Sequence, residues 1–320
     1  MRALAVLCAA AMLAASATHA RTTIKVAIEL PESSLMYQMF LHMKARLETR
    51  VPAADLDFQI FANGQLGRDQ AILNGLRQGT HQMGAHCSTY GAIEPGMAVF
   101  EAPFIFANRD HVRKAIYGPV GQTLLRRADS KGLVGLAIGE LGFRHISNNT
   151  RPIVTPADLK GLKIRVPNSP FRAEMFQAYG ASTAPIAFGE LYMALRQGVV
   201  DGQENPLASV FSNKLQEVQK FVSISNHVFT PCFILASKTV FSTWPAPLQE
   251  AVRAAAREAG EFSLKRGAEM DSELIRELGK TSAVNQVDVA AFKAASKPIY
   301  DQIAKAAGAD LMAMMLEAVR

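Results

Sequence analysis

The sequence lacks the short motifs that mark most nucleotide, metal and hydrolase sites. It has no GxGxxG fingerprint and no Walker A motif, which leaves nucleotide binding unsupported. It also has no HExxH motif, no clustered cysteines and histidines, and no GxSxG elbow. We therefore expect no metal, no cofactor and no catalytic constellation of these kinds.

Cysteine is scarce, with three in 320 residues. Cys8 lies in the N-terminal apolar segment described below, so a mature protein would keep Cys87 and Cys232. These two could form one disulfide in an oxidising compartment, but each lies in an apolar, strand-like stretch. We expect two free thiols, because a chain of this length buries a core that needs no covalent crosslink.

Blocks of one charge are also missing. The net charge is +6, yet no run contains five or more basic residues and no aromatic residues alternate with them. Nucleic-acid binding is therefore not expected, whereas a mildly positive protein suits an anionic ligand. After residue 20, no apolar run reaches the roughly 18 residues of a membrane-spanning helix, so we expect a protein that does not itself span a membrane.

The first 20 residues have the pattern of a secretory signal peptide. Arg2 provides a basic start, residues 3–15 are apolar, and Thr18-His19-Ala20 places small residues where a signal peptidase cuts. Ala15-Ser16-Ala17 is a second possible cleavage site. We expect an exported protein that is cleaved near Ala20.

The next part of the chain alternates strands with helices. Strands are expected over residues 22–30, 56–61 and 83–88, and a helix with apolar residues at helical spacing follows each of the first two. This order predicts a parallel, doubly wound sheet with ligand contacts at the carboxyl ends of the strands.

The sequence pattern changes after Gly142, where a second, smaller set of strands and helices begins. Strands are expected over residues 163–166, 184–187 and 199–203. The apolar stretch 222–237 is expected to be one strand that passes between two domains. A long helix from Pro245 to about Lys280 is expected to lie across both.

Arg165 lies in the middle of a well-defined local pattern. Thr155 can cap a helical turn that starts at Pro156, Gly161 ends that turn, and residues 163–166 form a short apolar strand. A guanidinium in such surroundings needs a partner, and a carboxylate matches its planar fork. The partner is either an internal Asp or Glu or the carboxylate of a ligand.

Three further residues follow or end short strands near Arg165 in the expected fold: Arg144, Phe188 and Asn205. The strand ends of a doubly wound domain share one rim, so two guanidiniums, an amide and an aromatic ring would meet at one cleft. That set suits a small organic anion. Taken singly, Arg144 could be a surface charge, Phe188 a core residue and Asn205 a helix cap.

Five segments of the chain together carry a family resemblance. They are Asn63-Gly64-Gln65-Leu66-Gly67, Gly142-Phe143-Arg144-His145-Ile146-Ser147-Asn148, Leu159-Lys160-Gly161-Leu162-Lys163-Ile164-Arg165-Val166-Pro167, Ala187-Phe188-Gly189-Glu190-Leu191-Tyr192 and Gly198-Val199-Val200-Asp201-Gly202-Gln203-Glu204-Asn205-Pro206. In their order and spacing they resemble the periplasmic substrate-binding proteins of TRAP (tripartite ATP-independent periplasmic) transporters of the dicarboxylate-binding type. The similarity extends from about residue 22 to residue 280.

This resemblance implies two doubly wound α/β domains joined by a hinge and closing over a carboxylate. Domain I would comprise residues 21–142 and about 231–270, and domain II residues 143–230 and about 271–320. The resemblance implies that Arg165 forms the salt bridge to the ligand carboxylate, that Arg144 and Asn205 assist it, and that Phe188 lines the pocket.

The resemblance also implies the biological setting. The protein would be periplasmic, would lack enzymatic and ATPase activity, and would deliver a small organic acid to a TRAP membrane permease driven by an ion gradient. C4-dicarboxylates, sugar acids, keto or hydroxy monocarboxylates and aromatic acids are all candidate ligands. Monomer and dimer both remain open.

Some residues near the expected cleft depart from the family pattern. His86-Cys87-Ser88 occupies a place where many relatives carry other polar or small residues, and Glu140 comes just before the Arg144 segment. We expect Cys87, Glu140 and Glu32 to contribute to specificity, with Cys87 and Glu140 as candidate ligand contacts.

Two other function classes compete with this one. A secreted lyase or hydrolase acting on a small acid would need a general base, for which Glu140, Glu190 or His227 is available. The second is an ABC-type anion-binding protein, which the motif set argues against and for which ligand uptake would depend on ATP rather than on a sodium gradient. Chemical conversion of the ligand would identify the enzyme. Dependence of uptake on ATP would identify the ABC-type protein.

Overall fold

The computed structural model describes residues 21–320, so the predicted signal peptide and its cleavage site lie outside the described residues. The strands are β1 Thr22–Ala27, β2 Leu56–Phe61, β3 Met83–His86, β4 Leu133–Asn148, β5 Lys163–Val166, β6 Ser182–Pro185, β7 Gly202–Pro206, β8 Phe221–Ile224, β9 Phe229–Ser237 and β10 Ala283–Gln286. The α-helices are α1 Leu35–Glu48, α2 Asp69–Gln78, α3 Arg109–Tyr117, α4 Pro119–Arg127, α5 Pro170–Ala178, α6 Leu191–Arg196, α7 Leu207–Ser212, α8 Lys238–Phe241, α9 Ala246–Leu278, α10 Val289–Ala307 and α11 Ala309–Ala318.

Local sequence signals account for several elements. The Ser34 side chain accepts a hydrogen bond from the backbone N–H of Tyr37, and α1 begins directly after it and buries the apolar face expected from the spacing. Thr155 and Asp158 form a capping box on the short 3-10 turn Pro156–Leu159. Gly161 follows with a φ of +80°, and β5 covers the residues predicted for it.

The strands join in a mixed sheet in the order β2-β1-β3-β9-β4-β7-β5-β6, with β8 and β10 attached beside β4. Strand β1 is parallel to β2 and β3, and β5 is parallel to β6 and β7. Strand β9, however, enters between β3 and β4 and runs antiparallel to both. The expected α/β fold is therefore confirmed, but the sheet is not purely parallel.

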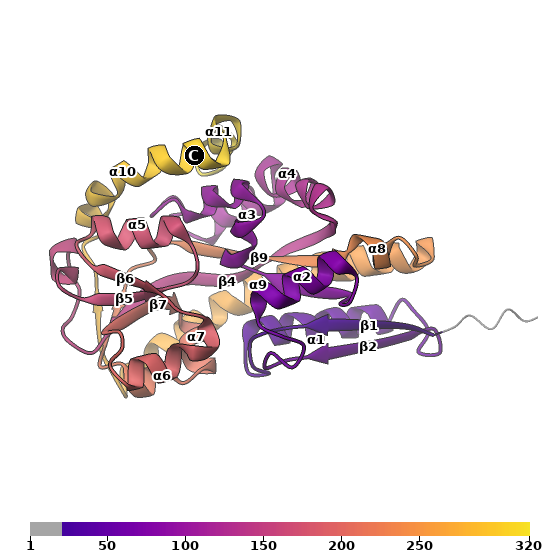
Figure 1. Cartoon of the computed structure of the whole chain (residues 1–320), viewed down its shortest axis with the longest axis horizontal. Coiled ribbons are helices and arrows are strands. Elements are labelled where there is room, and N and C mark those ends of the chain that lie inside the picture. Colours follow the sequence, from indigo (N-terminus) through magenta and orange to yellow (C-terminus); the bar gives the residue numbers. More distant parts are fainter. Residues whose placement is uncertain (1–20) are drawn as a thin grey trace, which may run out of the picture.

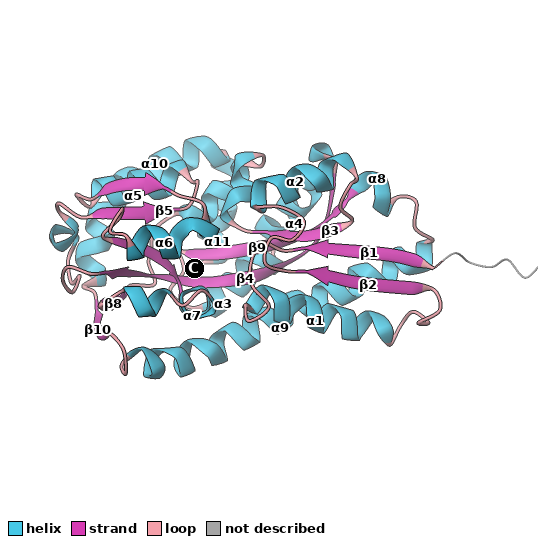
Figure 2. Cartoon of the chain, turned by 60° about the horizontal axis from the view of Figure 1, so that its bottom comes forward, coloured by secondary structure: helices cyan, strands magenta, loops and turns pink. Residues whose placement is uncertain are grey.

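Figures 1 and 2 show two lobes that share the long strands β4 and β9. The first lobe contains β1–β3 with α1 and α2, and the second contains β5–β7 with α5–α7. Strand β4 has 16 residues and pairs with β9 along one part and with β7 and β8 along the other. It is thus the strand that passes through both lobes.

The prediction of one strand over residues 222–237 is wrong. The stretch forms two strands, β8 and β9, and the turn between them includes Asn226 with a φ of +48°. A left-handed residue cannot continue a strand, and Asn tolerates that conformation better than most residues. Both strands pair with β4, at different positions along it.

The long helix is confirmed: α9 has 33 residues and packs against α1, β4 and α7, so it contacts elements of both lobes (Figure 2). The C-terminal helices α10 and α11 also contact both parts of the chain. Helix α10 packs on α5, while α11 packs on α3 and α4.

The limits of domains I and II given in the sequence analysis remain a prediction. Within residues 21–320, no helix is long and apolar enough to cross a membrane.

The expectation of two free thiols is wrong, because Cys87 and Cys232 form a disulfide. The antiparallel pairing of β3 with β9 places His86 opposite Phe233, so the residues next to them also face each other. The two Cα atoms are 4.2 Å apart although 145 residues separate them in the sequence. Apolar strand surroundings therefore indicated burial of the sulfurs, but not their chemical state.

Candidate functional site

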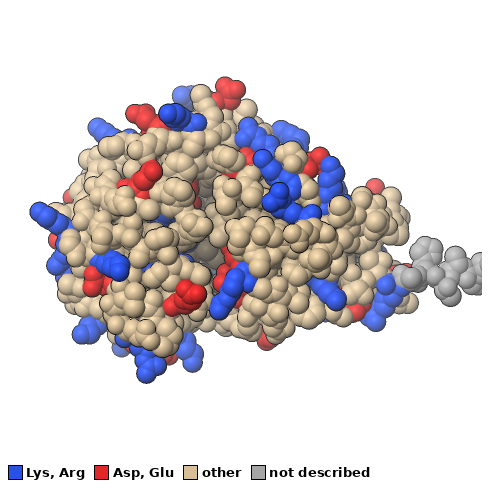
Figure 3. Space-filling view, in the orientation of Figure 1, with Lys and Arg blue, Asp and Glu red and all other residues tan. Residues whose placement is uncertain are grey.

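A cavity of about 490 Å³ lies between the two lobes, and Figure 3 shows the surface hollowed there. Its walls come from the ends of β1, β3 and β5, the start of α2, and residues of β4 and β7. Five of the six predicted site residues line it: Arg165, Arg144, Asn205, Phe188 and Cys87. The fold thus brings together residues that are far apart in the sequence.

Arg165 is buried in the cavity wall without an acidic partner. Only 2% of its surface is exposed, its Nε donates to the backbone oxygen of Ile186 at 2.9 Å, and its guanidinium lies 5.7 Å from the centre of the Phe188 ring. Within residues 21–320, it forms no ion pair with an Asp or Glu side chain. Burial, reinforced by the positive charge of Arg144, lowers the pKa of Arg165 to about 9.

Arg144, in contrast, is paired with a carboxylate of the protein. Its Nε donates to one carboxylate oxygen of Glu204, and its Nη2 donates to the other at 2.8 Å and to the Glu204 backbone oxygen at 2.6 Å. The same Nη2 donates to Asn205 Oδ1 at 3.0 Å. The surface-charge alternative is wrong for Arg144, because only 2% of its surface is exposed.

Glu204 belongs to a buried chain of ion pairs. Arg172 Nη1 donates to Glu204 at 2.6 Å, and Arg172 Nη2 donates to Glu101 at 2.7 Å. His227 Nε2 lies 3.1 Å from the same Glu204 oxygen that Arg172 contacts. Burial by itself would raise the pKa of Glu204, but Arg144 and Arg172 lower it well below its usual range.

The charge balance of these buried ion pairs determines which cation is available to bind a ligand. Two guanidiniums, Arg144 and Arg172, match two carboxylates, Glu101 and Glu204. Arg165 is left as the unmatched positive charge of this group. Sequence reasoning missed Arg172 and Glu101, because nothing in their local pattern distinguishes a buried charge from one on a surface helix.

Asn205 and Phe188 complete this wall. Asn205 lies within β7 opposite His145 on β4, and its Nδ2 donates to Gln203 Oε1 at 2.5 Å. The helix-cap alternative for Asn205 is therefore wrong. Phe188 is half-buried and packs against the apolar clusters of both lobes. Its ring consequently joins the two sides of the cavity.

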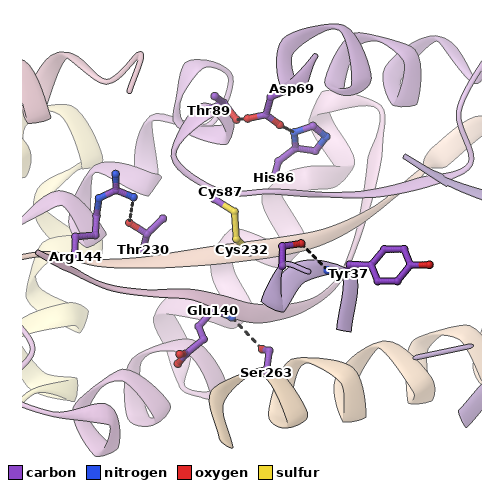
Figure 4. The surroundings of a disulfide bond; sticks show 11 residues. Tyr37, Asp69, His86, Cys87, Thr89, Glu140, Arg144, Thr230, Cys232 and Ser263 are labelled. Atoms are coloured by element: carbon purple, nitrogen blue, oxygen red, sulfur yellow. Dashed lines mark hydrogen bonds and ion pairs between the residues drawn. A yellow bond between two sulfur atoms is a disulfide. The ribbon is translucent and has the colours of Figure 1, made fainter. Parts of the chain in front are cut away.

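The first lobe contributes two carboxylates to the cavity. Asp69, at the start of α2, has its Oδ1 2.7 Å from His86 Nδ1 and its Oδ2 hydrogen-bonded to the hydroxyl of Thr89. Figure 4 shows this group beside the Cys87–Cys232 disulfide. Burial opposes ionisation of Asp69, but His86 and Thr89 outweigh it and lower the pKa of Asp69. The sequence analysis did not single out Asp69.

Glu29, which follows β1, is the second carboxylate. Its Oε1 is buried without a hydrogen-bond partner, and its contact to Arg68 Nη1 is 3.6 Å long. Burial and the nearby Asp69 raise the pKa of Glu29 above its usual value. The sequence analysis expected Glu32 near the ligand, but Glu32 is exposed and does not line the cavity.

The structure does not bring Glu140 to the cavity. Its carboxylate is held by Arg109, through Nε at 3.1 Å and Nη2 at 2.8 Å, and Arg109 also binds Asp271 at 2.8 Å. The Glu140 backbone N–H donates to Ser263 on α9 at 3.0 Å (Figure 4). The expectation that Glu140 faces the cleft is therefore corrected: it ties β4 to α9 instead.

Comparison with known proteins places this geometry in context. Residues 26–306 match the family model described as bacterial extracellular solute-binding protein, family 7. The 2,3-diketo-L-gulonate-binding periplasmic protein YiaO of Escherichia coli is 36% identical over 265 residues, which cover 81% of this chain and 80% of that protein.

Two solved structures of TRAP periplasmic solute-binding proteins superpose closely. The protein from Polaromonas sp. JS666 with bound D-erythronate has a TM-score of 0.88 and 31% identity, covering 92% of this chain and 98% of that one. The protein from Sulfurospirillum deleyianum with bound succinate has a TM-score of 0.87 and 30% identity, covering 93% and 99%.

Proposed function

Because the chain belongs to family 7 of the bacterial extracellular solute-binding proteins, we propose that Arg165 captures the carboxylate of a small organic acid in the cavity between its lobes. The protein serves transport as a substrate-binding protein, and structurally similar relatives hold carboxylates such as succinate and D-erythronate. The anchoring residue and the ligand of this chain are the parts we propose.

The observation that carries this proposal is the unmatched charge of Arg165. A buried guanidinium without an anion is unfavourable, and a ligand carboxylate would supply two charge-assisted hydrogen bonds in one plane. Arg144 cannot take this role in the same way, because Glu204 already occupies its fork. Arg144 would instead assist by holding the Asn205 side chain in position through their hydrogen bond.

Closure of the two lobes over the ligand is the second part of the proposal. Phe188 packs against apolar residues of both lobes, and the Arg68 guanidinium lies so close to Gly189 that a Cβ there would be 1.7 Å from its Nη1. These contacts between the lobes can form only when the two lobes are close together. A ligand that touches both walls would therefore favour the closed form.

We propose that the protein is exported to the periplasm and cleaved near Ala20, and that its closed, loaded form hands the ligand to a TRAP membrane permease driven by an ion gradient. We also propose that it is not an enzyme. Of the candidate general bases, Glu140 and His227 are held in ion pairs or hydrogen bonds away from the cavity, and Glu190 is exposed outside it.

A thermal-shift screen of residues 21–320 against a panel of organic acids tests the proposal. An acid at about 100 times its Kd should add about 2.7 kcal/mol of stability, and the shift should vanish in Arg165→Ala. Recovery of the acid unchanged after incubation separates binding from turnover. Equal shifts in the wild type and Arg165→Ala would refute the assignment of Arg165, and conversion of the acid would establish the enzyme alternative.

A further inference from the structure

The cavity has two walls of opposite electrostatic character. Arg165 in the second lobe is a cation without a carboxylate partner, whereas the first lobe presents the carboxylates of Glu29 and Asp69 beside the largely exposed Arg68. The charges are close enough to influence one another, because Glu29 favours the protonated form of Arg165. A ligand that spans the cavity meets a cation at one end and acceptors at the other.

The first-lobe wall that carries Glu29 and Asp69 has fewer hydrogen-bond donors than its carboxylate oxygens can accept. Glu29 Oε1 is buried without a partner, and its nearest cation, Arg68, is 3.6 Å away and 61% exposed on its side chain. The two oxygens of Asp69 each have one partner, His86 and Thr89, and a carboxylate oxygen can accept a second bond. Donors on the ligand would fill these positions.

We infer that Glu29 and Asp69 select a monocarboxylate whose far end carries hydroxyl groups, and that they disfavour a second carboxylate. This inference rests on the proposed function, since it assumes that Arg165 holds the first carboxylate. A dicarboxylate in the same pose would place its second charge against these two carboxylates, and the single, largely exposed Arg68 offsets only part of that repulsion, so affinity is lost. Hydroxyl groups would donate to Glu29 and Asp69 without adding charge.

Hydroxyl groups also fit better than an ammonium group. The polar surroundings of the two carboxylates include neutral side chains, Ser88 and Gln70, that can exchange hydrogen bonds with a hydroxyl-bearing chain. Arg68 beside Glu29 already supplies one positive charge, so a ligand cation there would face a like charge. The surroundings therefore favour a neutral donor.

The test uses four acids with the same four-carbon chain: erythronate (2,3,4-trihydroxybutanoate), butanoate, succinate and 4-aminobutanoate. Their Kd values are measured by calorimetry on the wild type, Glu29→Gln and the matched control Glu32→Gln, which makes the same change at an exposed position outside the cavity. We expect the wild type to bind erythronate at least about tenfold tighter than each of the others.

In Glu29→Gln, the preference for erythronate over succinate should shrink about tenfold, while Glu32→Gln should keep the wild-type preference. The melting temperature without ligand shows whether Glu29→Gln folds. Equal or tighter binding of succinate or 4-aminobutanoate by the wild type overturns the inference, as does an unchanged preference in Glu29→Gln. If those acids bind but still require Arg165, the proposed function survives; if binding is independent of Arg165, the proposed function fails first.

Discussion

The guanidinium of Arg165 lies over the ring of Phe188 at 5.7 Å, and its remaining donors have no carboxylate partner within residues 21–320. An aromatic face attracts a cation but cannot replace an anion, so the pair holds the guanidinium in place without satisfying it. This arrangement is the one expected of an arginine that binds a ligand anion rather than of a structural arginine. Arg144, on β4 and separated from β5 by β7, has the opposite arrangement with Glu204.

Arg165→Lys should weaken ligand binding by about 10- to 100-fold, because lysine keeps the charge but loses the planar fork. The matched control is Arg196→Lys, which lies on an exposed position outside the cavity and should bind as the wild type does. Calorimetric titration with the best acid from the screen measures the effect. Wild-type affinity in Arg165→Lys would contradict bidentate capture.

Arg165→Leu should leave the stability of the ligand-free protein unchanged or raise it by about 1 kcal/mol, because it removes a buried charge without a partner. Urea unfolding without ligand provides the measurement. A loss of several kcal/mol would mean that the guanidinium has an internal partner after all.

Glu204→Gln should destabilise the protein by about 3–5 kcal/mol, because it leaves Arg144 and Arg172 as buried charges with too few carboxylates. The exposed Glu190→Gln should change the unfolding free energy by no more than about 0.5 kcal/mol. Urea denaturation monitored by circular dichroism compares the two. Similar small effects for both variants would refute the buried network.

The exported protein should contain no free thiol, because Cys87 and Cys232 are joined. Thiol titration of denatured, unreduced protein checks this count. Replacing both cysteines by alanine should lower the unfolding free energy by about 2–5 kcal/mol, since the bond closes a loop of 145 residues. Two reactive thiols in the unreduced protein would contradict the disulfide.

Glu140→Gln should leave ligand affinity within about twofold of the wild-type value, because Glu140 lies outside the cavity.

The effect of Glu140→Gln on the free energy of unfolding should depend on pH. Burial raises the pKa of Glu140 from 4.5 to about 7 in spite of Arg109. Between these two pH values Glu140 is therefore protonated in the folded protein but ionised in the unfolded chain. The wild type should therefore lose about 3 kcal/mol relative to Glu140→Gln as the pH rises from 4.5 to 7.

Urea unfolding of the wild type and Glu140→Gln at pH 4.5, 6 and 8 measures that difference. A stability gap that stays constant across this range would show that Glu140 titrates normally. A large loss of ligand affinity in Glu140→Gln would instead return this residue to the binding site.

Local patterns in the sequence were sufficient for many of the elements. The cap at Ser34 and the spacing of apolar residues predict α1, and the turn ending at Gly161 together with Pro167 delimits β5. Each of these signals acts within a few residues, so no tertiary information is needed. The resemblance to the solute-binding family added what such patterns cannot contain, namely the separate roles of Arg165, Arg144, Phe188 and Asn205 toward a ligand carboxylate.

Other features depend on strand pairing between distant parts of the chain. The antiparallel entry of β9 beside β3 decides the disulfide between Cys87 and Cys232, and the turn at Asn226 decides that residues 222–237 form two strands. Glu140 points to α9 rather than to the cleft because Arg109 binds its carboxylate there. None of these partners is near in sequence.

The sequence by itself determined many of the α/β elements, the long helix α9, and the presence of arginines in apolar strands that require anionic partners. Only the tertiary structure decided which arginine has an internal partner: Glu204 matches Arg144 and Arg172, and Arg165 is left facing the cavity. The physical reason is that a buried charge is governed by the sum of the charges around it, and that sum comes from strands and helices brought together only by folding.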